Sequence, residues 1–414
     1  MDNIIRGVKA IQVLDSRGIP TIQTKVFTKD LSAKAIVPSG LSKGKYEAFE
    51  LRDNSKSYHG LSVLEAVNNV NRVISKELVG TDVTDQKAID EFLIGFDGTP
   101  NKSRLGANAI LSVSLAAARC GSFVQNKHLY EYLGSKRVLP VPFSNVINGG
   151  VHSDNRLHVQ EFMIAPVKAK SFSEATMMVS EVYHSLKEVI KKRFGKHSTL
   201  VADEGGFSPP VDTVHSAFNL ILKSIDECGY SNKVKLAIDC AASEFFTGVN
   251  YKIEKNKLLT SSELIDYYKN LVKTYPIVSI EDPFHQDDFS SFKELTKKLN
   301  IQVVGDDLLT TNIRRIKLAV NEKLCNALLL KPNQIGTLTE SILAHRLAKE
   351  SKWNVMVSHR SGDTEDTFIC DLAVALGSGQ VKIGTTCRAE STSKFNRLLE
   401  IENYLGSKAK YAKF

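Results

Sequence analysis

The second half of the chain repeats one pattern that limits its fold: short apolar segments of strand length alternate with amphipathic segments of helix length. The strand-like segments lie beyond about residue 230 and read VKLAIDC, IVSIEDPF, IQVVGDDLL, NALLLKPN, WNVMVSHR and QVKIGTT. Strands that alternate with helices of about ten to fifteen residues form parallel βαβ units, and a barrel is the natural closure of such a series. We therefore expect a parallel α/β barrel here.

The first 130 residues or so have a different pattern. Three segments with strand-like alternation, VKAIQVLDSRG, TIQTKVFT and AKAIVPSG, predict a small antiparallel sheet. Two helix-like segments, SVLEAVNNVNRVISKEL and GANAILSVSLAAARCG, follow them. We expect an N-terminal α+β domain over residues 1–133 and a C-terminal barrel domain over residues 139–414, with the boundary at the proline-containing VLPVPF.

Charge and composition exclude several classes of protein. The net charge is +8, but the lysines are spread out, and the basic stretch KEVIKKRFGKH is better explained as a solvated helix face than as a nucleic-acid site. Six cysteines without a CxxC pair indicate neither a disulfide framework nor a zinc site. We expect no apolar stretch to reach the length of a membrane span, and the start of the chain resembles no secretory signal. We therefore expect a cytoplasmic protein without membrane or nucleic-acid partners.

An ionisable residue stands at the C-terminal end of each of the six strand-like segments. These residues are Asp239, Glu281, Asp306, Lys331, His359 and Lys382. In a parallel barrel the C-terminal strand ends open on one face, where catalytic residues of such barrels lie. A strand end that is polar only because the chain emerges from the core would explain one case, but it explains six poorly. We therefore expect a single pocket.

The types of these residues indicate metal-assisted proton transfer. Asp239, Glu281 and Asp306 form a set of hard oxygen donors that suits Mg²⁺, the alternative being a structural ion-pair network. Beside a divalent metal and Lys382, the pKa of Lys331 should fall, which would leave a neutral amine able to accept a proton. Such a base suits proton abstraction from carbon beside a metal-bound carboxylate.

Two earlier motifs could supply a general acid and its support. VADEGGFSP places Glu204 before two glycines in a tight turn, and NGGVHSDNRLHVQEFMIAP offers His152, Gln160 and Glu161. Taken alone, each motif is more often a turn with satisfied polar groups.

A third motif, SHRSGDTED, places Arg360 and Ser361 after a strand and before a helix-like segment. The planar guanidinium and the free N–H groups of a helix start would cradle a phosphate or carboxylate. A capping role for Ser361 or Thr364 is the alternative.

GLSKG at residues 40–44 matches the G-x-S-x-G pattern of a hydrolase nucleophile, with Ser42 as the nucleophile. That pattern requires a central strand before it and a helix after it, whereas this segment follows Pro38 in the antiparallel region. A mobile glycine-rich lid over the barrel mouth fits better.

Together these motifs resemble the enolase family over nearly the whole chain. The resemblance is carried by VLDSRG, VPSGLSKGKYEAFELRD, INGGVHSDNRLHVQEFMIAP, ADEGGFSP, AIDCAASEFF, SIEDPF, GDDLLTTN, LLLKPNQIGTLTE, SHRSGDTEDTFICDLAV and GQVKIG. It implies a small N-terminal α+β domain on an atypical eight-stranded α/β (TIM-like) barrel, assembled as a homodimer. It also implies the reversible dehydration of 2-phosphoglycerate to phosphoenolpyruvate in glycolysis and gluconeogenesis, with two Mg²⁺ ions per site.

The resemblance also implies a role for each motif residue. Lys331 would abstract the C2 proton, and Glu204, assisted by Glu161, would protonate the departing C3 hydroxyl. The first Mg²⁺ would be held by the carboxylates of Asp239, Glu281 and Asp306. Ser39 would reach the second Mg²⁺, which arrives with the substrate. The residues implied in substrate binding are His152, Gln160, Glu161, Lys331, Ser358, His359, Arg360, Ser361 and Lys382.

The chain departs from the family pattern in two segments. SGLSKG stands where the family usually has SGASTG, so that Leu41 is bulkier and Lys43 adds a cation near the phosphate. RAEST stands for the usual RSERL, with Ser391 in place of an arginine that could support the subunit contact. The rival hypothesis is a non-catalytic binding protein on an enolase scaffold, whose expected mark, loss of a metal ligand or of Lys331, is not seen in the sequence.

Overall fold

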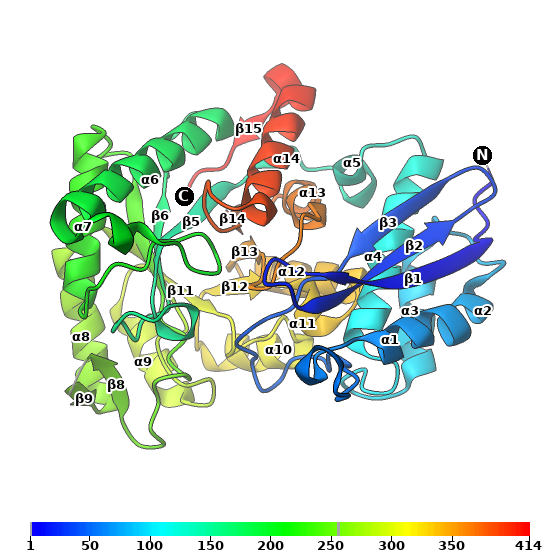
Figure 1. Cartoon of the computed structure of the whole chain (residues 1–414), viewed down its shortest axis with the longest axis horizontal. Coiled ribbons are helices and arrows are strands. Elements are labelled where there is room, and N and C mark those ends of the chain that lie inside the picture. The colour runs from blue at the N-terminus through cyan, green and yellow to red at the C-terminus, as the bar shows by residue number, and fades with distance from the viewer. Residues whose placement is uncertain (1, 255–256) are drawn as a thin grey trace.

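The computed structural model describes residues 2–254 and 257–414. The N-terminal part carries the expected antiparallel sheet, in the order β1-β2-β3 (Figure 1). Its strands are β1 Gly7–Leu14, β2 Pro20–Phe27 and β3 Ser32–Ile36. Its helices are α1 Leu64–Asn68, α2 Ser75–Leu78, α3 Gln86–Asp97, α4 Ala107–Val124 and α5 Leu129–Leu133, with a π-helical turn at Asn69–Ile74 and a 3₁₀ turn at Ser57–Gly60. The predicted α+β character of this part is confirmed.

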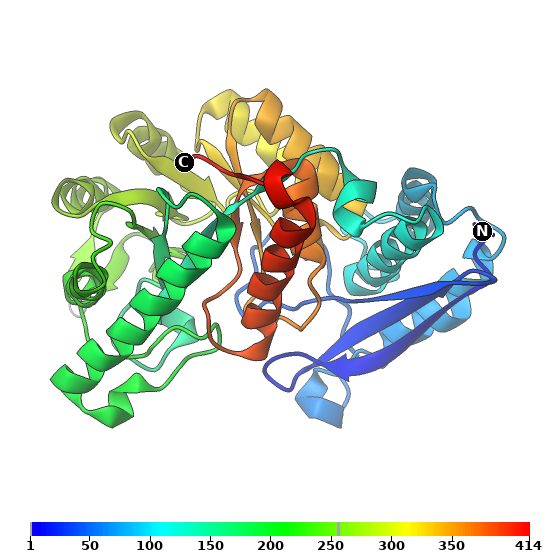
Figure 2. The ribbon, with the colours of Figure 1, turned by 90° about the horizontal axis from the view of Figure 1, so that it is seen from above.

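Helix α4 is the central helix of the N-terminal part and packs on β2 and β3 (Figure 2). Its 18 residues have a mean hydropathy of 1.3, so by length and composition alone it could cross a membrane. Within the protein, however, 83% of it is buried, as in the core helix of a folded domain. The expectation that no apolar stretch approaches the length of a membrane span is therefore wrong for α4.

The rest of the chain forms a closed eight-stranded barrel in the order β10-β11-β12-β13-β14-β5-β6-β7. The expected parallel run from β7 through β10 to β14 is confirmed. β5, which was not predicted, extends this run in parallel, whereas β6 is antiparallel to both of its neighbours. β6 can return antiparallel beside β5 because the two are joined by a loop without a crossover helix. The strands are β5 Val141–Asn148, β6 Glu161–Ala165, β7 Lys235–Asp239, β10 Ile277–Glu281, β11 Gln302–Gly305, β12 Ala327–Leu330, β13 Asn354–Ser358 and β14 Gly379–Lys382.

Helices surround the barrel, with α6 and α7 paired on one side and α14 running beside α6 (Figure 1). They are α6 Phe172–Phe194, α7 Val214–Glu227, α8 Ser261–Thr274, α9 Phe289–Lys298, α10 Ile313–Glu322, α11 Pro332–Ile335, α12 Leu338–Glu350, α13 Phe368–Leu376 and α14 Ala389–Leu405. The remaining pieces are β4 Val138–Leu139 with β15 Lys410–Tyr411, β8 Tyr251–Glu254 with β9 Lys257–Leu259, and the 3₁₀ turns Gly150–His152, Lys196–Thr199 and Gly406–Lys408.

The barrel interior is a packed core rather than a pore. Along β12, Ala327 and Leu329 belong to the interior cluster, whereas Leu328 and Leu330 belong to the outer cluster beneath the helices. This alternation is the two-residue period of a strand with both faces buried. Such strands read as continuous apolar runs, which is why the segment NALLLKPN was recognisable as a strand.

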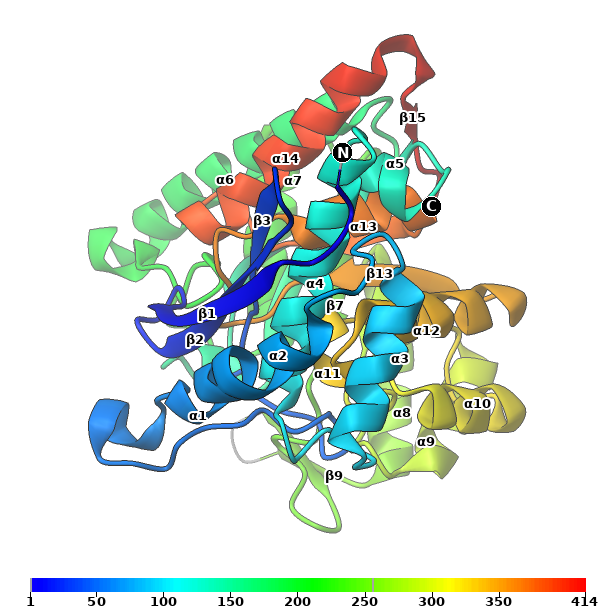
Figure 3. The same ribbon diagram turned by 90° about the vertical axis from the view of Figure 1, so that its right-hand side faces the viewer.

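The N-terminal part braces the barrel at the start of α12 (Figure 3). Ser114 Oγ accepts from the N–H of Leu338 at 3.0 Å, and Asp90 accepts from the N–H of Thr339 at 2.8 Å. Lys102 pairs with Glu340 at 3.0 Å. These contacts satisfy N–H groups that a helix start leaves without an intrahelical partner, and they fix the segment that follows β12.

We expect Leu329→Ala to lower the free energy of unfolding by about 2–5 kcal/mol, because it leaves a cavity among fully buried neighbours inside the barrel. The matched control is Leu343→Ala on α12, where the side chain is 44% exposed and the change should stay within about 0.5 kcal/mol. Urea unfolding of both variants measures the difference, and equal losses would mean that the interior is loosely packed.

Candidate active site

All six predicted strand-end residues lie at one rim of the barrel. Asp239, Glu281 and Lys382 are the last residues of β7, β10 and β14. Asp306, Lys331 and His359 directly follow β11, β12 and β13. The prediction that these groups meet on one face is confirmed.

Lys382 lies among three carboxylates. Its Nζ is 2.9 Å from Asp239 Oδ2, 2.9 Å from Glu281 Oε1 and 3.1 Å from Glu161 Oε2. Burial lowers the pKa of Lys382, but the attraction of Asp239 and the other carboxylates outweighs it and holds this pKa well above its usual value. Lys382 is therefore a fixed positive charge within the acidic cluster.

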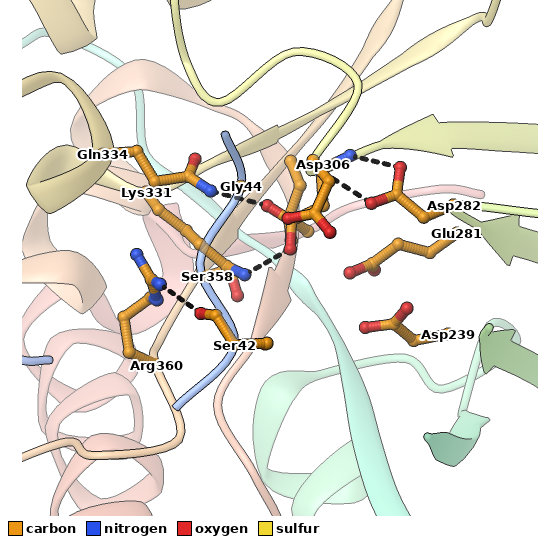
Figure 4. A network of polar contacts seen from close by, with 12 residues as sticks. Ser42, Gly44, Asp239, Glu281, Asp282, Asp306, Lys331, Gln334, Ser358 and Arg360 are labelled. Carbon is orange, nitrogen blue, oxygen red and sulfur yellow. Dashed lines mark hydrogen bonds and ion pairs between the residues drawn. The ribbon is translucent and has the colours of Figure 1, made fainter. Parts of the chain in front are cut away.

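Lys331 contacts Asp306, which follows the neighbouring strand, at the barrel mouth (Figure 4). Its Nζ donates to Asp306 Oδ2 at 2.6 Å, and Gln334 Nε2 donates to the other oxygen, Oδ1, at 2.8 Å. Burial lowers the pKa of Lys331, but the attraction of Asp306, together with that of Glu281, outweighs it, so that the net shift is upward. The upward shift arises because the ammonium directly contacts a carboxylate; the predicted fall, which supposes a divalent metal beside Lys331, stays a prediction. A cation held by Asp306 would compete with Lys331 for that carboxylate and favour the neutral amine.

Asp282 lies next to the acidic cluster and positions the backbone of Asp306. It was not among the predicted site residues. Its carboxylate accepts the backbone N–H groups of Asp306 at 3.0 Å and of Asp307 at 2.6 Å, which fixes the turn after β11 (Figure 4). Burial, and then the charge of Asp307, raise the pKa of Asp282 well above its usual value. Because both oxygens are engaged by the backbone, this carboxylate has little capacity left for a metal ion.

The acidic cluster fits a hard cation. Oε2 of Glu281 has no hydrogen-bond partner among the described residues, and burial, together with the charge of Asp239, raises the pKa of Glu281 well above its usual value. Both observations indicate more buried negative charge than the lysines satisfy. Asp239, Glu281 and Asp306 are oxygen donors of the type Mg²⁺ prefers. In the described part of the chain, two groups of residues have metal-ligating atoms within 4.8 Å of one another. They are His152, Glu161 and Glu204, and Asp282, Asp306 and Asp307, and neither is the predicted set.

Glu161 and Glu204 form a buried pair beside the cluster. Asn145 Nδ2 donates to Glu204 Oε2 at 2.9 Å, and His152 Nδ1 lies 3.6 Å from the same oxygen. Burial, and then the charge of Glu204, raise the pKa of Glu161 well above its usual value. Burial also opposes ionisation of Glu204, but His152, together with His359 and Lys382, outweighs it and lowers the pKa of Glu204 well below its usual value. The two pKa shifts thus run in opposite directions, so that Glu161 keeps its proton to a higher pH than Glu204 does.

The turn that carries Glu204 requires its two glycines. Gly205 has a φ of 86°, which favours glycine, and a Cβ at Gly206 would lie 2.5 Å from Asn148 Oδ1. The tight turn expected from VADEGGFSP is therefore present.

Other predicted substrate-binding groups line the same mouth. Burial lowers the pKa of His359 to about 3, so that its imidazole is neutral. His359 Nε2 and Gln160 Oε1 have no hydrogen-bond partner within residues 2–254 and 257–414, nor does either ring nitrogen of His152. Ser358 Oγ donates to the carbonyl of His359 at 2.9 Å. The buried polar atoms of His152, Gln160 and His359 are thus free to bind a ligand.

Arg360 and Ser361 meet the glycine-rich loop of the N-terminal part. Arg360 pairs with Glu47 through two hydrogen bonds of 3.0 and 3.1 Å, and its Nη2 also donates to the carbonyl of Ser42 at 3.0 Å (Figure 4). Ser361 Oγ accepts from the N–H of Leu41 at 2.8 Å. Glu47 was not among the predicted site residues, because no local sequence pattern indicates a contact with a residue 313 positions away.

Ser39 is held by the protein itself. Its N–H and carbonyl pair with Gly362, and its Oγ accepts from Arg52 at 3.1 Å. Ser42, weighed from the sequence only as a nucleophile, is the loop serine whose carbonyl contacts Arg360. It follows no central strand, so the hydrolase pattern lacks its structural context.

Buried polar contacts with Asp363 fix the backbone of Arg360. Asp363 Oδ2 accepts from the N–H of Arg360 at 3.2 Å, and Lys394 on α14 lies 3.1 Å from Asp363 Oδ1. The VLDSRG turn packs against the same segment, with the N–H of Ser16 donating to the carbonyl of Asp363 at 2.8 Å. These supporting contacts give the VLDSRG motif a structural role that the sequence alone did not indicate.

Comparison with known proteins agrees with the fold. Residues 5–133 match the family model described as enolase, N-terminal domain, and residues 136–414 match enolase, C-terminal TIM barrel domain. The chain is 53% identical to an enolase of Methanocaldococcus jannaschii over 411 residues, covering 99% of this chain and 97% of the relative. It is 50% identical to enolases of Solanum lycopersicum, with 99% and 97% covered, and of Methanococcus vannielii, with 98% and 97% covered. Family models over both parts of the chain, and relatives at least half identical along almost all of it, show that this chain belongs to the enolase family.

Proposed function

We propose that this chain catalyses the reversible dehydration of 2-phospho-D-glycerate to phosphoenolpyruvate and water, the enolase reaction of glycolysis and gluconeogenesis. Relatives named enolase at 50–53% identity support this activity. The observation that carries it is a buried lysine, Lys331, facing an acidic cluster across a mouth that also holds the Glu161–Glu204 pair. A base on one side and a proton-holding pair nearby are what removal of a C2 proton and a C3 hydroxyl require.

We propose that the substrate is anchored by its phosphate and its carboxylate. Arg360 and Ser361 would bind the phosphate, since a guanidinium and a hydroxyl match its oxygens. Lys382 would offset the charge of the carboxylate. The remaining groups that would contact the substrate are His152, Gln160, Ser358 and His359.

Asp239, Glu281 and Asp306 would hold the first Mg²⁺, and Ser39 is the proposed ligand of a second Mg²⁺ that arrives with the substrate. Bound there, the metal would supply positive charge to a substrate carboxylate that becomes more negative as C2 loses its proton. For the second ion, Ser39 would have to release at least one of its contacts with Arg52 and Gly362.

Two proton transfers then divide between the two sides of the mouth. Lys331 Nζ would take the proton from C2. Glu204 would protonate the departing C3 hydroxyl, and Glu161, which holds the proton of the pair, would supply it. The opposite pKa shifts of Glu161 and Glu204 support these two roles, because Glu161 must carry a proton that Glu204 can pass on to the hydroxyl.

We further propose a cytoplasmic homodimer with an N-terminal domain over residues 1–133 and a catalytic barrel over residues 139–414. The family resemblance supports the assembly, and the separate family-model matches support the division. A binding protein without activity remains the rival, but no replaced site residue favours it.

The purified chain should form phosphoenolpyruvate from 2-phosphoglycerate, followed by ultraviolet absorbance, and EDTA should stop this formation until Mg²⁺ is added back. The dependence follows from buried carboxylates that require a cation to neutralise them. Activity that persists unchanged in EDTA would contradict the metal assignment, and no product under any condition would favour the binding protein.

Lys331→Ala should reduce exchange of the C2 proton by about 10²–10⁴-fold while leaving substrate binding largely intact, because a general base contributes about that factor. Exchange in deuterated water, followed by NMR, and a separate binding titration give the two readouts. Lys317→Ala, an exposed lysine on α10, is the control. An equal loss of binding and exchange would mean that Lys331 serves mainly as a charge clamp.

Glu204→Gln should block dehydration yet permit C2 exchange, because the amide cannot deliver a proton while the base on the opposite side is unchanged. The same NMR exchange measurement, combined with the absorbance assay, separates the two steps. Glu244→Gln changes an exposed carboxylate and should affect neither. Absence of exchange in Glu204→Gln would sink the proposed division of roles.

A further inference from the structure

The loop at residues 39–47 belongs to the N-terminal part but lies across the barrel mouth, and it is held there from two sides. On its inner side, Glu47 pairs with Arg360, and Gln334 lies 3.4 Å from Glu47 Oε1. The N–H of Ala48 donates to the carbonyl of Gln334 at 2.8 Å. These inner contacts belong to the site already described.

On its outer side, the loop is held by a cluster that has no catalytic assignment. Tyr46 donates its hydroxyl hydrogen to Asp287 Oδ1 at 2.7 Å, and the Arg315 guanidinium lies over the Tyr46 ring at 4.0 Å. The N–H of Lys45 donates to Gln286 Oε1 at 3.0 Å. The loop is thus tied both to the segment after β10 and to the first turn of α10.

Arg315 is itself rigidly placed. Its Nε donates to the carbonyl of Leu308 and its Nη2 donates to the carbonyl of Gln286, both at 2.8 Å. Its side chain is only 11% exposed. A guanidinium fixed in this way offers a preformed platform for an aromatic ring, so that Tyr46 finds both its ring partner and its hydroxyl partner in place.

We propose that Tyr46 is a positioning residue that latches the 39–47 loop onto the barrel rim and thereby keeps Glu47 and Ser42 against Arg360. The proposal rests on the proposed function, because it takes Arg360 as the phosphate ligand. Tyr46 lies next to Glu47 in the chain, so the position of one constrains the other. Releasing the ring would let the loop leave the mouth, and Ser39 with it, without altering Lys331, Glu204 or the three carboxylates proposed for the first Mg²⁺.

Loss of the latch therefore has a distinct kinetic signature. When only a fraction of molecules holds the binding-competent conformation, the apparent affinity falls in proportion to that fraction. We expect Tyr46→Ala to raise KM for 2-phosphoglycerate about tenfold while kcat changes less than about twofold. Tyr46→Phe keeps the ring on Arg315 but loses the hydroxyl, and should give a smaller rise in KM.

A second readout does not depend on turnover. Lys43 and Lys45 are exposed in the loop, so trypsin can cleave there once the loop leaves the rim. Tyr46→Ala should be cleaved at these lysines several-fold faster than the unmodified chain, with an unchanged melting temperature. Tyr58→Ala, whose ring is 50% exposed elsewhere in the N-terminal part, is the matched control and should behave like the unmodified chain in both assays.

Two results would overturn the latch. One is cleavage of Tyr46→Ala at the rate of the unmodified chain. The other is a fall in both kcat and melting temperature with no change in KM, which is the result expected of a merely structural residue. If the unmodified chain forms no phosphoenolpyruvate, the proposed function fails, whereas the trypsin comparison still decides whether Tyr46 holds the loop.

Discussion

Compensation of buried charge is the constraint on which this barrel mouth depends. Asp239, Glu281 and Glu161 converge on Lys382, and Asp306 converges on Lys331, all with almost no access to water. Charges in such a place are tolerated only when each has an opposite charge or a hydrogen-bond donor within reach. The raised pKa values of Glu161 and Glu281 show that the lysines leave part of the negative charge uncompensated. The electrostatics of the mouth therefore favour either a bound cation or protonated carboxylates.

The same constraint explains why the N-terminal part contributes to a site whose other charged residues come from the barrel. Arg360 is 5% exposed, and its charge is compensated by Glu47, from the other end of the chain. Contacts of Ser39 with Gly362, and of Leu41 with Ser361, also hold the backbone of the loop against the segment that follows Arg360. The glycine-rich loop is therefore fitted to the phosphate-side segment along its length, and Tyr46 fixes its outer edge.

Much of this arrangement could be predicted from the sequence, since it follows from local periodicity. The continuous apolar runs of β7 and β10–β14 identified strands buried on both faces, and the polar residue after each run identified the rim. β5 and β6 gave no comparable signal, because Pro142 interrupts β5 and β6 runs against the parallel order. Contacts between distant segments were also out of reach. No local pattern predicts the direct Lys331–Asp306 contact, and Glu47 and Asp282 act through partners that no spacing rule connects.

The ion pair between Glu47 and Arg360 also has a consequence for the order in which the protein becomes competent. The two residues are 313 positions apart, so a ribosome completes the N-terminal sheet and its helices long before the guanidinium is synthesised. Until then Glu47 lacks its partner, although Asp287 and Arg315, which contact the outer side of the loop, have already been made. A chain truncated before β13 would therefore contain every residue of the outer contacts and still lack the Glu47–Arg360 ion pair.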